Sequence, residues 1–190
     1  MSTKTEKLTF EAYLALPETK QRYEIVDGVL IMPPAPTPAH QWFSKRIFLR
    51  LDNFVEERRL GVVLFAPVDL LIQREPLRTR QPDILYLSAR RTGIRGLAEL
   101  QGLQFLEIPP DLVVEVLSPS NTRRDIEGKL EDYRRIGVRE CWLASPEAET
   151  IEVLGLSAQE SGMTSIFGVN DSLRSPVLGD FTLRLREVFR

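Results

Sequence analysis

One stretch, residues 110–133, constrains the possible folds of this chain more than any other. Residues 112–117 read Leu-Val-Val-Glu-Val-Leu, a nearly continuous apolar run typical of a strand that is covered on both faces. A polar turn follows, and then an amphipathic helix over residues 122–136. A second buried strand is expected at residues 140–145. This order predicts a parallel crossover within a mixed sheet.

Two charged residues stand out in this strand, turn and helix. Glu115 interrupts the apolar strand, and its carboxylate must be protonated, paired or bound to a cation, because desolvating a bare charge is very costly. At 100° per residue, Lys129 falls within the apolar arc of the helix, together with Ile126, Leu130 and Tyr133. Lys129 either pairs with Glu115 or extends along the apolar surface to reach water. Both interpretations remain open at this point.

Periodicity and turn residues predict the remaining elements. The expected fold class is α/β: a mixed β-sheet core flanked by helices, with an N-terminal helix and a β-hairpin, in a single domain over residues 1–190. The Asp27-Gly28 pair between two apolar runs is a strong hairpin signal. The predicted elements are helix 10–16, hairpin 22–32, helix 38–60, strands 62–66 and 68–72, a polar loop at 74–81, strand 83–87, a long connection at 88–110 with a short helix near 97–100, strand 150–156, a loop at 157–161, edge strands 163–167 and 181–185, and a helical turn at 186–189.

Composition excludes several classes of function. The formal net charge of −2 gives no overall basic surface for nucleic acid, although arginines are frequent between residues 74 and 95. Cys141 is the single cysteine, which excludes an internal disulfide and a thiolate zinc site and predicts a buried structural thiol. Met1–Lys7 is polar, and no apolar stretch is long enough to cross a membrane. We therefore expect a cytoplasmic protein without a membrane partner.

A second acid lies at the start of a predicted strand. Asp83 follows Pro82 and opens strand 83–87. If this strand lies beside strand 112–117, the carboxylates of Asp83 and Glu115 converge. Two carboxylates with open coordination positions suit Mg²⁺ or Mn²⁺, which prefer hard oxygen ligands. Such a site points to metal-assisted phosphodiester hydrolysis.

These residues resemble a known family. The Pro82-Asp83 pair, Glu115 and Lys129 resemble the PD-(D/E)XK nuclease superfamily, and the likeness from about residue 8 to the C-terminus is closest to the Uma family of restriction-endonuclease-like proteins. The motifs that carry this resemblance are Tyr23-Glu-Ile-Val-Asp-Gly28, Pro82-Asp-Ile84, Asp111-Leu-Val-Val-Glu-Val-Leu-Ser-Pro-Ser120, Lys129-Leu-x-x-Tyr133 and Ser175-Pro-Val-Leu178.

The resemblance implies a restriction-endonuclease-like mixed sheet with a metal site at one end. It implies that Asp83 and Glu115 bind Mg²⁺ or Mn²⁺, with the Val116 carbonyl as a third ligand. Asp83, Glu115, Lys129 and Glu24 form the implied catalytic set. From its residues alone, Glu24 is equally well explained as a water-facing residue of the hairpin.

One position departs from the superfamily pattern. The superfamily places its lysine two residues after the acid, where this chain has Leu117, so Lys129 would supply the amine from the adjacent helix. Contacts to nucleic acid are predicted for several polar side chains, although capping, packing or solvation explains them as well. These candidates are His40, Arg78, Arg80, Ser118 and Arg123.

Two functions follow from this sequence. The first is a divalent-metal-dependent endonuclease that hydrolyses nucleic acid, with DNA expected as the substrate before RNA, as a homodimer by analogy with other nucleases of this fold. The second is a catalytically inactive binding or interaction module, in which Glu115 and Lys129 form a structural ion pair. A hydrolase that uses serine and histidine is a weaker alternative, because the chain has no Gly-x-Ser-x-Gly motif.

Overall fold

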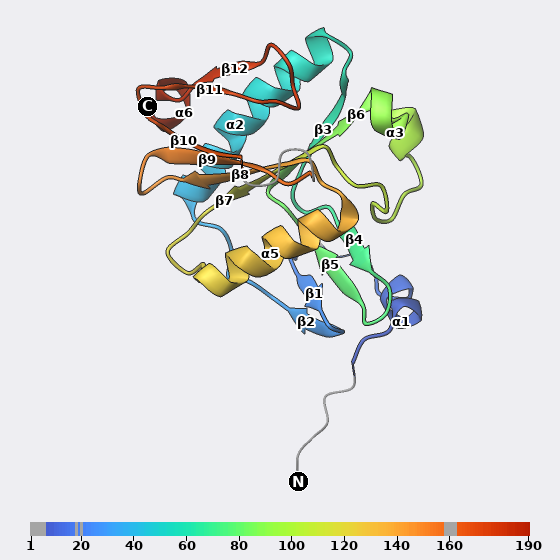
Figure 1. Ribbon diagram of the computed structural model, residues 1–190. Helices are drawn as coiled ribbons and strands as arrows, with labels where there is room; N and C mark the ends of the chain where they lie inside the picture. Colours follow the sequence, from blue (N-terminus) through green and yellow to red (C-terminus); the bar gives the residue numbers. More distant parts are fainter. Residues whose placement is uncertain (1–6, 18, 20, 158–162) are drawn as a thin grey trace.

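A six-stranded mixed sheet forms the centre of the molecule (Figure 1). The structure is a computed structural model, and it describes residues 7–17, 19, 21–157 and 163–190. The strand order is β10-β9-β8-β7-β6-β3. The strands are β3 (Gly61–Phe65), β6 (Ile84–Ser88), β7 (Leu112–Val116), β8 (Glu140–Ser145), β9 (Thr150–Gly155) and β10 (Thr164–Gly168).

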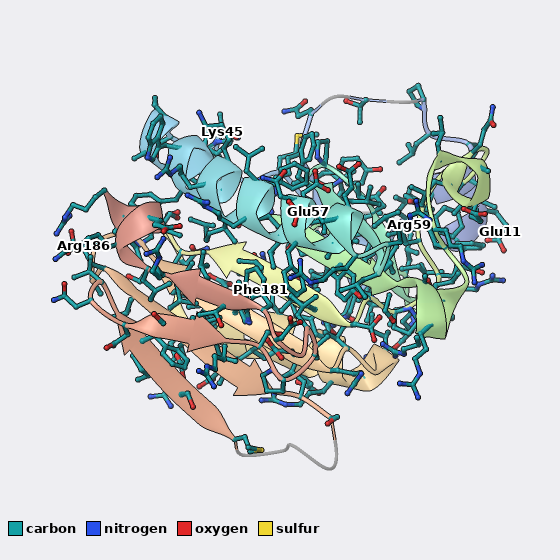
Figure 2. The ribbon with its side chains drawn as sticks, turned by 90° about the horizontal axis from the view of Figure 1, so that it is seen from above. Glu11, Lys45, Glu57, Arg59, Phe181 and Arg186 are labelled. Atoms are coloured by element: carbon teal, nitrogen blue, oxygen red, sulfur yellow. The ribbon has the colours of Figure 1, made fainter. Side chains whose placement is uncertain are left out.

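Helices cover both faces of this sheet, as Figures 1 and 2 show. On one face, α5 (Arg123–Ile136) packs Tyr133 against the apolar side chains of β6, β7 and β8. On the other face, α2 (Pro38–Glu57) packs Ile47, Leu51 and Val55 against the sheet. The C-terminal elements β11 (Ser172–Arg174), β12 (Thr182–Arg184) and α6 (Arg186–Phe189) complete this second core. The predicted α/β fold is confirmed.

A smaller sheet lies beside the central one. Its strand order is β2-β1-β5-β4, and the short helix α1 (Phe10–Leu14) packs against it. Asp27 and Gly28 both have positive φ, 52° and 78°, as a tight hairpin between β1 and β2 requires. The predicted N-terminal helix and hairpin are therefore confirmed. The strands are β1 (Glu24–Val26), β2 (Val29–Ile31), β4 (Leu70–Gln73) and β5 (Arg78–Arg80).

The predicted strand, turn and helix of residues 110–133 form as expected. β7 and β8 are parallel and are connected by α5. The side chain of Thr122 caps the helix by accepting a hydrogen bond from the Asp125 amide, and Gly137, with φ of 86°, ends it. On the other side of β7, β6 pairs in antiparallel fashion, with Ile84 opposite Val114. The strand after Asp83 therefore neighbours the strand of Glu115, which is the condition under which the two carboxylates were expected to converge.

Several local predictions were wrong. The polar loop predicted at 74–81 contains strand β5, which pairs with β1 and β4. The helix α2 ends at Glu57, ahead of the predicted residue 60, because Arg59 takes a left-handed conformation with φ of 54°. The edge strand predicted at 181–185, by contrast, was correct: it forms β12, which pairs with β11 in a separate two-stranded sheet. The long connection contains α3 (Ala89–Thr92) besides the expected α4 (Leu97–Leu100), and most of the loop predicted at 157–161 lies outside the described residues.

Candidate active site

Glu115 lies at the centre of a buried ionic cluster. The Nζ atom of Lys129, from α5, is 2.8 Å from Glu115 Oε2 and 3.2 Å from Glu24 Oε1 of β1. The side chains of Glu115, Lys129 and Glu24 are only 8%, 17% and 12% exposed. Lys129 therefore bridges two acids, and Glu24 is not the water-facing strand residue that its position in a hairpin first indicated.

Burial controls the protonation of this cluster. Burial raises the pKa of Glu115, and the nearby positive charge of Lys129 opposes this effect only in part. Burial alone would lower the pKa of Lys129, but the charges of Glu115 and Glu24 outweigh it and raise this pKa. The hydroxyl of Tyr133 donates a hydrogen bond to the other oxygen of Glu115. Both Glu115 oxygens therefore accept hydrogen bonds from α5, which places the carboxylate accurately at the end of β7.

Asp83 is held by a different set of donors. Its Oδ2 accepts a hydrogen bond from the Val116 amide at 2.7 Å and lies 3.3 Å from His40 Nε2, while its Oδ1 lies 2.5 Å from Arg22 Nη1. Burial alone would raise the pKa of Asp83, but the hydrogen bond with His40, the charge of Arg22 and the Val116 amide together lower it to about 2. Asp83 is therefore a carboxylate at neutral pH.

Strand pairing joins the two sets of residues. Because Ile84 lies opposite Val114 in an antiparallel pair, Asp83 lies one position further along, opposite Glu115. Arg22 interacts electrostatically with both acids and with Glu24. The structure thus brings the sequence-predicted Asp83, Glu115, Lys129 and Glu24 to one end of the central sheet. Their direct contacts form two groups, Glu115 with Lys129 and Glu24, and Asp83 with Arg22 and His40.

The arginines of β5 have a different environment from the one predicted for them. Arg80 Nη1 lies 2.7 Å from Glu24 Oε2, and Arg80 Nη2 lies 2.7 Å from Asp132 Oδ2. Arg78 contacts Asp132 at 3.1 Å and Asp27 at 2.6 Å. Arg78 and Arg80 were expected in a polar loop facing phosphates. Both instead neutralise internal acids from a strand, so this geometry does not favour them as contacts to nucleic acid.

The three other nucleic-acid candidates lie at different places. His40 contacts Asp83, and so belongs to the candidate site itself. The Ser118 hydroxyl and amide interact with Asn121 within the turn after β7. Arg123 is 92% exposed and forms a surface pair with Glu127. Their contacts to nucleic acid stay predictions.

The donor set fits a hard divalent cation. Asp83, directly before β6, and Glu115 of β7 offer carboxylate oxygens, and Val116, the residue after Glu115, offers a backbone carbonyl. Among the described residues, no group of three or more His, Cys, Asp or Glu side chains could hold a metal ion. An ion here would therefore take at most two side-chain ligands and complete its shell with backbone and water, as Mg²⁺ commonly does.

A large cleft opens on the Asp83 side of this cluster. Its volume is about 810 Å³, and Asp83, Arg22 and His40 form part of its wall. The remaining wall comes from the proline-rich segment 33–38, the first half of α2 and the end of β3. Glu115 and Lys129 instead line a much smaller hollow on the α5 side. The two acids therefore line different clefts, Asp83 the wide one and Glu115 the narrow one.

Sequence reasoning missed three residues of this site. Arg22, Tyr133 and Asp132 had no assigned role, although Arg22 and Tyr133 each contact a predicted metal ligand. Tyr133 fell within the apolar arc of its helix, where its hydroxyl gave no separate signal. No local pattern distinguishes Arg22 or Asp132 from surface charges, because their partners lie more than fifty residues away in the chain.

The depressed pKa of Asp83 leads to a prediction on stability. Because the folded state lowers this pKa from 3.8 to about 2, ionised Asp83 stabilises the fold at pH values above about 4. This contribution is lost as the pH falls through about 2. We expect Asp83→Asn to lower the free energy of unfolding at neutral pH by about 2 kcal/mol. The difference from wild type should shrink between about pH 4 and pH 2, as measured by urea denaturation.

The control for this experiment is Asp180→Asn, which changes an acid that is 79% exposed. Little change in stability is expected for it. A difference between Asp83→Asn and wild type that stays constant over the whole pH range would contradict the electrostatic explanation. It would mean that the amide disturbs the packing around Arg22 and His40 instead.

Comparison with known proteins identifies the family and the fold of this chain. A family model, Uma2, described as "Putative restriction endonuclease", matches residues 10–186. The crystal structure of a "putative nuclease belonging to DUF820" from Anabaena variabilis superposes with a TM-score of 0.77 at 19% sequence identity, covering 96% of this chain and 97% of that one. At this identity the likeness establishes the fold. No curated protein matches the sequence. Among the described residues, no helix is both long enough and apolar enough to cross a membrane.

The family match spans nearly the whole chain, and the chain therefore belongs to the Uma2 family of restriction-endonuclease-like proteins.

Proposed function

We propose that this protein is a divalent-metal-dependent endonuclease that hydrolyses phosphodiester bonds of nucleic acid, and of DNA rather than RNA. The observation that carries the proposal is the direct contact of Lys129 with Glu115, which lies opposite Asp83 at the end of the sheet. These are the acid, acid and lysine of the superfamily pattern, with the lysine supplied by α5. The family description, a restriction endonuclease, favours DNA as the substrate.

Each residue has a distinct role in this proposal. Asp83, Glu115 and the Val116 carbonyl would hold Mg²⁺ or Mn²⁺, which when bound would supply Lewis-acid activation of water and phosphate. Lys129 keeps its proton because its pKa is raised, so it brings a positive charge to the place where negative charge develops on the phosphate. Glu24 orients Lys129 from the opposite side, and Arg80 in turn holds Glu24.

A specific observation also favours the second candidate, an inactive binding or interaction module. Both acids already have cationic partners within the protein, Lys129 for Glu115 and Arg22 for Asp83. An ion pair of this kind can stabilise the fold without any metal, because each charge neutralises the other. The two functions differ in whether the site binds a cation.

The first test is a calorimetric titration of Mn²⁺ into wild type, Asp83→Asn and Glu115→Gln. Loss of an outer-shell partner usually weakens metal binding 10- to 100-fold, so we expect each of these ligand substitutions to weaken it by at least about 100-fold. Glu127→Gln, which alters an exposed acid on the same helix as Lys129, should bind like wild type. Cleavage of supercoiled DNA in Mn²⁺, and of RNA as a comparison, completes the test.

The outcomes separate the two candidates clearly. Mn²⁺ binding that depends on both acids, together with cleavage that the same substitutions abolish, supports the nuclease. A wild-type protein that binds no Mn²⁺ and cleaves no nucleic acid would contradict it. The site would then be a structural ionic cluster in a binding module.

A homodimer remains part of our proposal. β2 is an edge strand of the smaller sheet, and its three residues are exposed although all are apolar: Val29 (45%), Leu30 (38%) and Ile31 (47%). An exposed apolar edge of this kind is prone to pair with another chain. Light scattering of the purified protein tests this proposal directly.

A further inference from the structure

We infer that the cleft beside Asp83 receives an unpaired nucleobase of a nucleic-acid strand. This inference rests on the proposed function, and it names the form of substrate that the same site takes. The cleft volume of about 810 Å³ is within the range of about 300–1,000 Å³ seen for sites that enclose small organic ligands. Because Asp83 lies in its wall, whatever fills the cleft is adjacent to the candidate metal ligands.

The chemistry of the wall matches the flat face of a base. Two aromatic side chains in it are unusually exposed, Trp42 at 48% and Phe65 at 61%. Prolines of the segment 33–38, with Phe48 and Leu49, supply further apolar surface. Exposed aromatic rings bind unpaired bases by stacking, and this recognition tolerates any sequence because every base has a π-face. In a duplex these faces are hidden, and the groove edges and phosphates are presented instead.

Positively charged side chains at the cleft are suited to contact the nucleic-acid phosphates on either side of such a base. The Nζ atom of Lys45 lies 4.4 Å from the centre of the Trp42 ring, with Arg46 also near that ring at 5.7 Å. Figure 2 labels Lys45 on the first half of α2. Arg22 lies at the Asp83 side of the cleft. A stacked base would thus have cations near both of its flanking phosphates.

The charge of the whole chain supports local recognition of this kind. With a formal net charge of −2, the protein has no overall positive field to attract a duplex. Short-range contacts such as stacking on Trp42 and Phe65 then contribute much of the affinity. The inference therefore commits to a single-stranded or locally unpaired segment as the occupant.

The chain provides a built-in probe for this inference. It contains two tryptophans, and Trp142 is completely buried in the core whereas Trp42 lies in the cleft. Stacking of a base should therefore quench the emission of Trp42 alone. We would titrate the protein in EDTA, which prevents cleavage, with a short DNA strand, the same strand annealed to its complement, and the equivalent RNA strand. Binding is followed by tryptophan emission and by anisotropy of a fluorescein label on the strand.

We expect the single strand to quench the emission and to bind more tightly than the duplex. Trp42→Ala and Phe65→Ala should each weaken strand binding about tenfold or more, as is usual when a stacking side chain is removed. Trp42→Phe should retain most of the affinity but lose the quenching. Ile166→Ala, which removes a side chain that is 67% exposed on the edge strand β10, is the matched control and should bind like wild type.

Several results would overturn the inference. Equal binding of duplex and strand would do so, as would wild-type binding by both Trp42→Ala and Phe65→Ala. A third result would do so as well: light scattering finds a dimer, Trp42→Ala converts it to a monomer, and the binding of nucleic acid is unchanged. A second copy of the chain would then be the occupant of the cleft.

Failure of the inference can be distinguished from failure of the proposed function. If Trp42→Ala cleaves the single DNA strand in Mn²⁺ at the wild-type rate, the proposed nuclease activity is supported and the proposed role of the cleft is contradicted. If strand binding in EDTA depends on Trp42 but no substrate is cleaved in Mn²⁺, the cleft binds nucleic acid in a protein that is not a nuclease.

Discussion

Replacing Lys129 by methionine is expected to slow phosphodiester hydrolysis about 10²- to 10³-fold, the usual loss when one preorganised group that stabilises developing negative charge is removed. Methionine keeps the length and much of the apolar volume of the side chain, but it removes the positive charge that lies 2.8 Å from Glu115. The metal ligands remain in place, so the variant should still bind Mn²⁺. The measurements are the cleavage rate at saturating Mn²⁺ and a calorimetric titration of the ion.

The same substitution should change the pH dependence of metal binding. Burial already raises the pKa of Glu115, and Lys129 is the charge that opposes this rise. Without Lys129 the pKa of Glu115 should rise further, so a proton competes with Mn²⁺ at higher pH than in wild type. The affinity of Lys129→Met for Mn²⁺ should therefore fall more steeply than that of wild type as the pH is lowered from 8 towards 6. This pH range is suitable because a rise in the pKa of a carboxyl group brings its titration closer to neutral pH.

Two control variants make this result interpretable. Lys129→Arg keeps the charge and should restore part of the activity, whereas Lys7→Met removes an exposed lysine near the N-terminus and should leave the rate unchanged. Circular dichroism shows whether each variant is folded. If Lys129→Met is folded and cleaves as fast as wild type, Lys129 is only a structural partner of Glu115.

Replacing Asp132 by alanine is expected to lower the free energy of unfolding by about 3–5 kcal/mol, the range for breaking a buried ion pair by removing one partner. Asp132 is 1% exposed and accepts contacts from both Arg78 and Arg80. Each arginine would keep one other acid, Asp27 for Arg78 and Glu24 for Arg80. Asp27 is half-exposed, so it compensates Arg78 only weakly. Urea denaturation measures the loss.

A surface pair on the same helix provides the control. Glu127→Ala breaks the contact between Glu127 and Arg123, whose side chains are 60% and 92% exposed, respectively. This substitution should change the free energy of unfolding by less than about 0.5 kcal/mol. If Asp132→Ala is as mild as Glu127→Ala, the cluster around β5 is not an important support of the fold. A large loss of unfolding free energy for Asp132→Ala would show that Arg80 needs Asp132 as a partner as well as Glu24. The position of Glu24 beside Lys129 would then depend on this buried network of charges.

The local pattern of the chain was sufficient for the main elements. The apolar run of β7, the Asp27-Gly28 turn and the amphipathic helix α5 depend mostly on residues within about ten positions of each other, which is the range over which periodicity acts. The same logic identified two candidate residues of the site. An acid inside an apolar run and a lysine inside an apolar arc are visible in a sequence, because each contradicts the pattern around it. Glu115 and Lys129 were found in this way, and the structure places them in contact.

The tertiary structure decided what no local pattern carries. β5 reads Arg-Thr-Arg and resembles a loop, yet it is a buried strand because Glu24 and Asp132 neutralise its arginines. Arg22 binds an acid 61 positions further along the chain. The sequence by itself thus determined most of the strands and helices and the unusual residues Glu115 and Lys129 within them, through local periodicity. The pairing of these charges, and the position of Asp83 in the wall of a cleft, depended on how the two sheets and the helices α2 and α5 come together. Contacts between distant residues leave no periodic pattern in the chain.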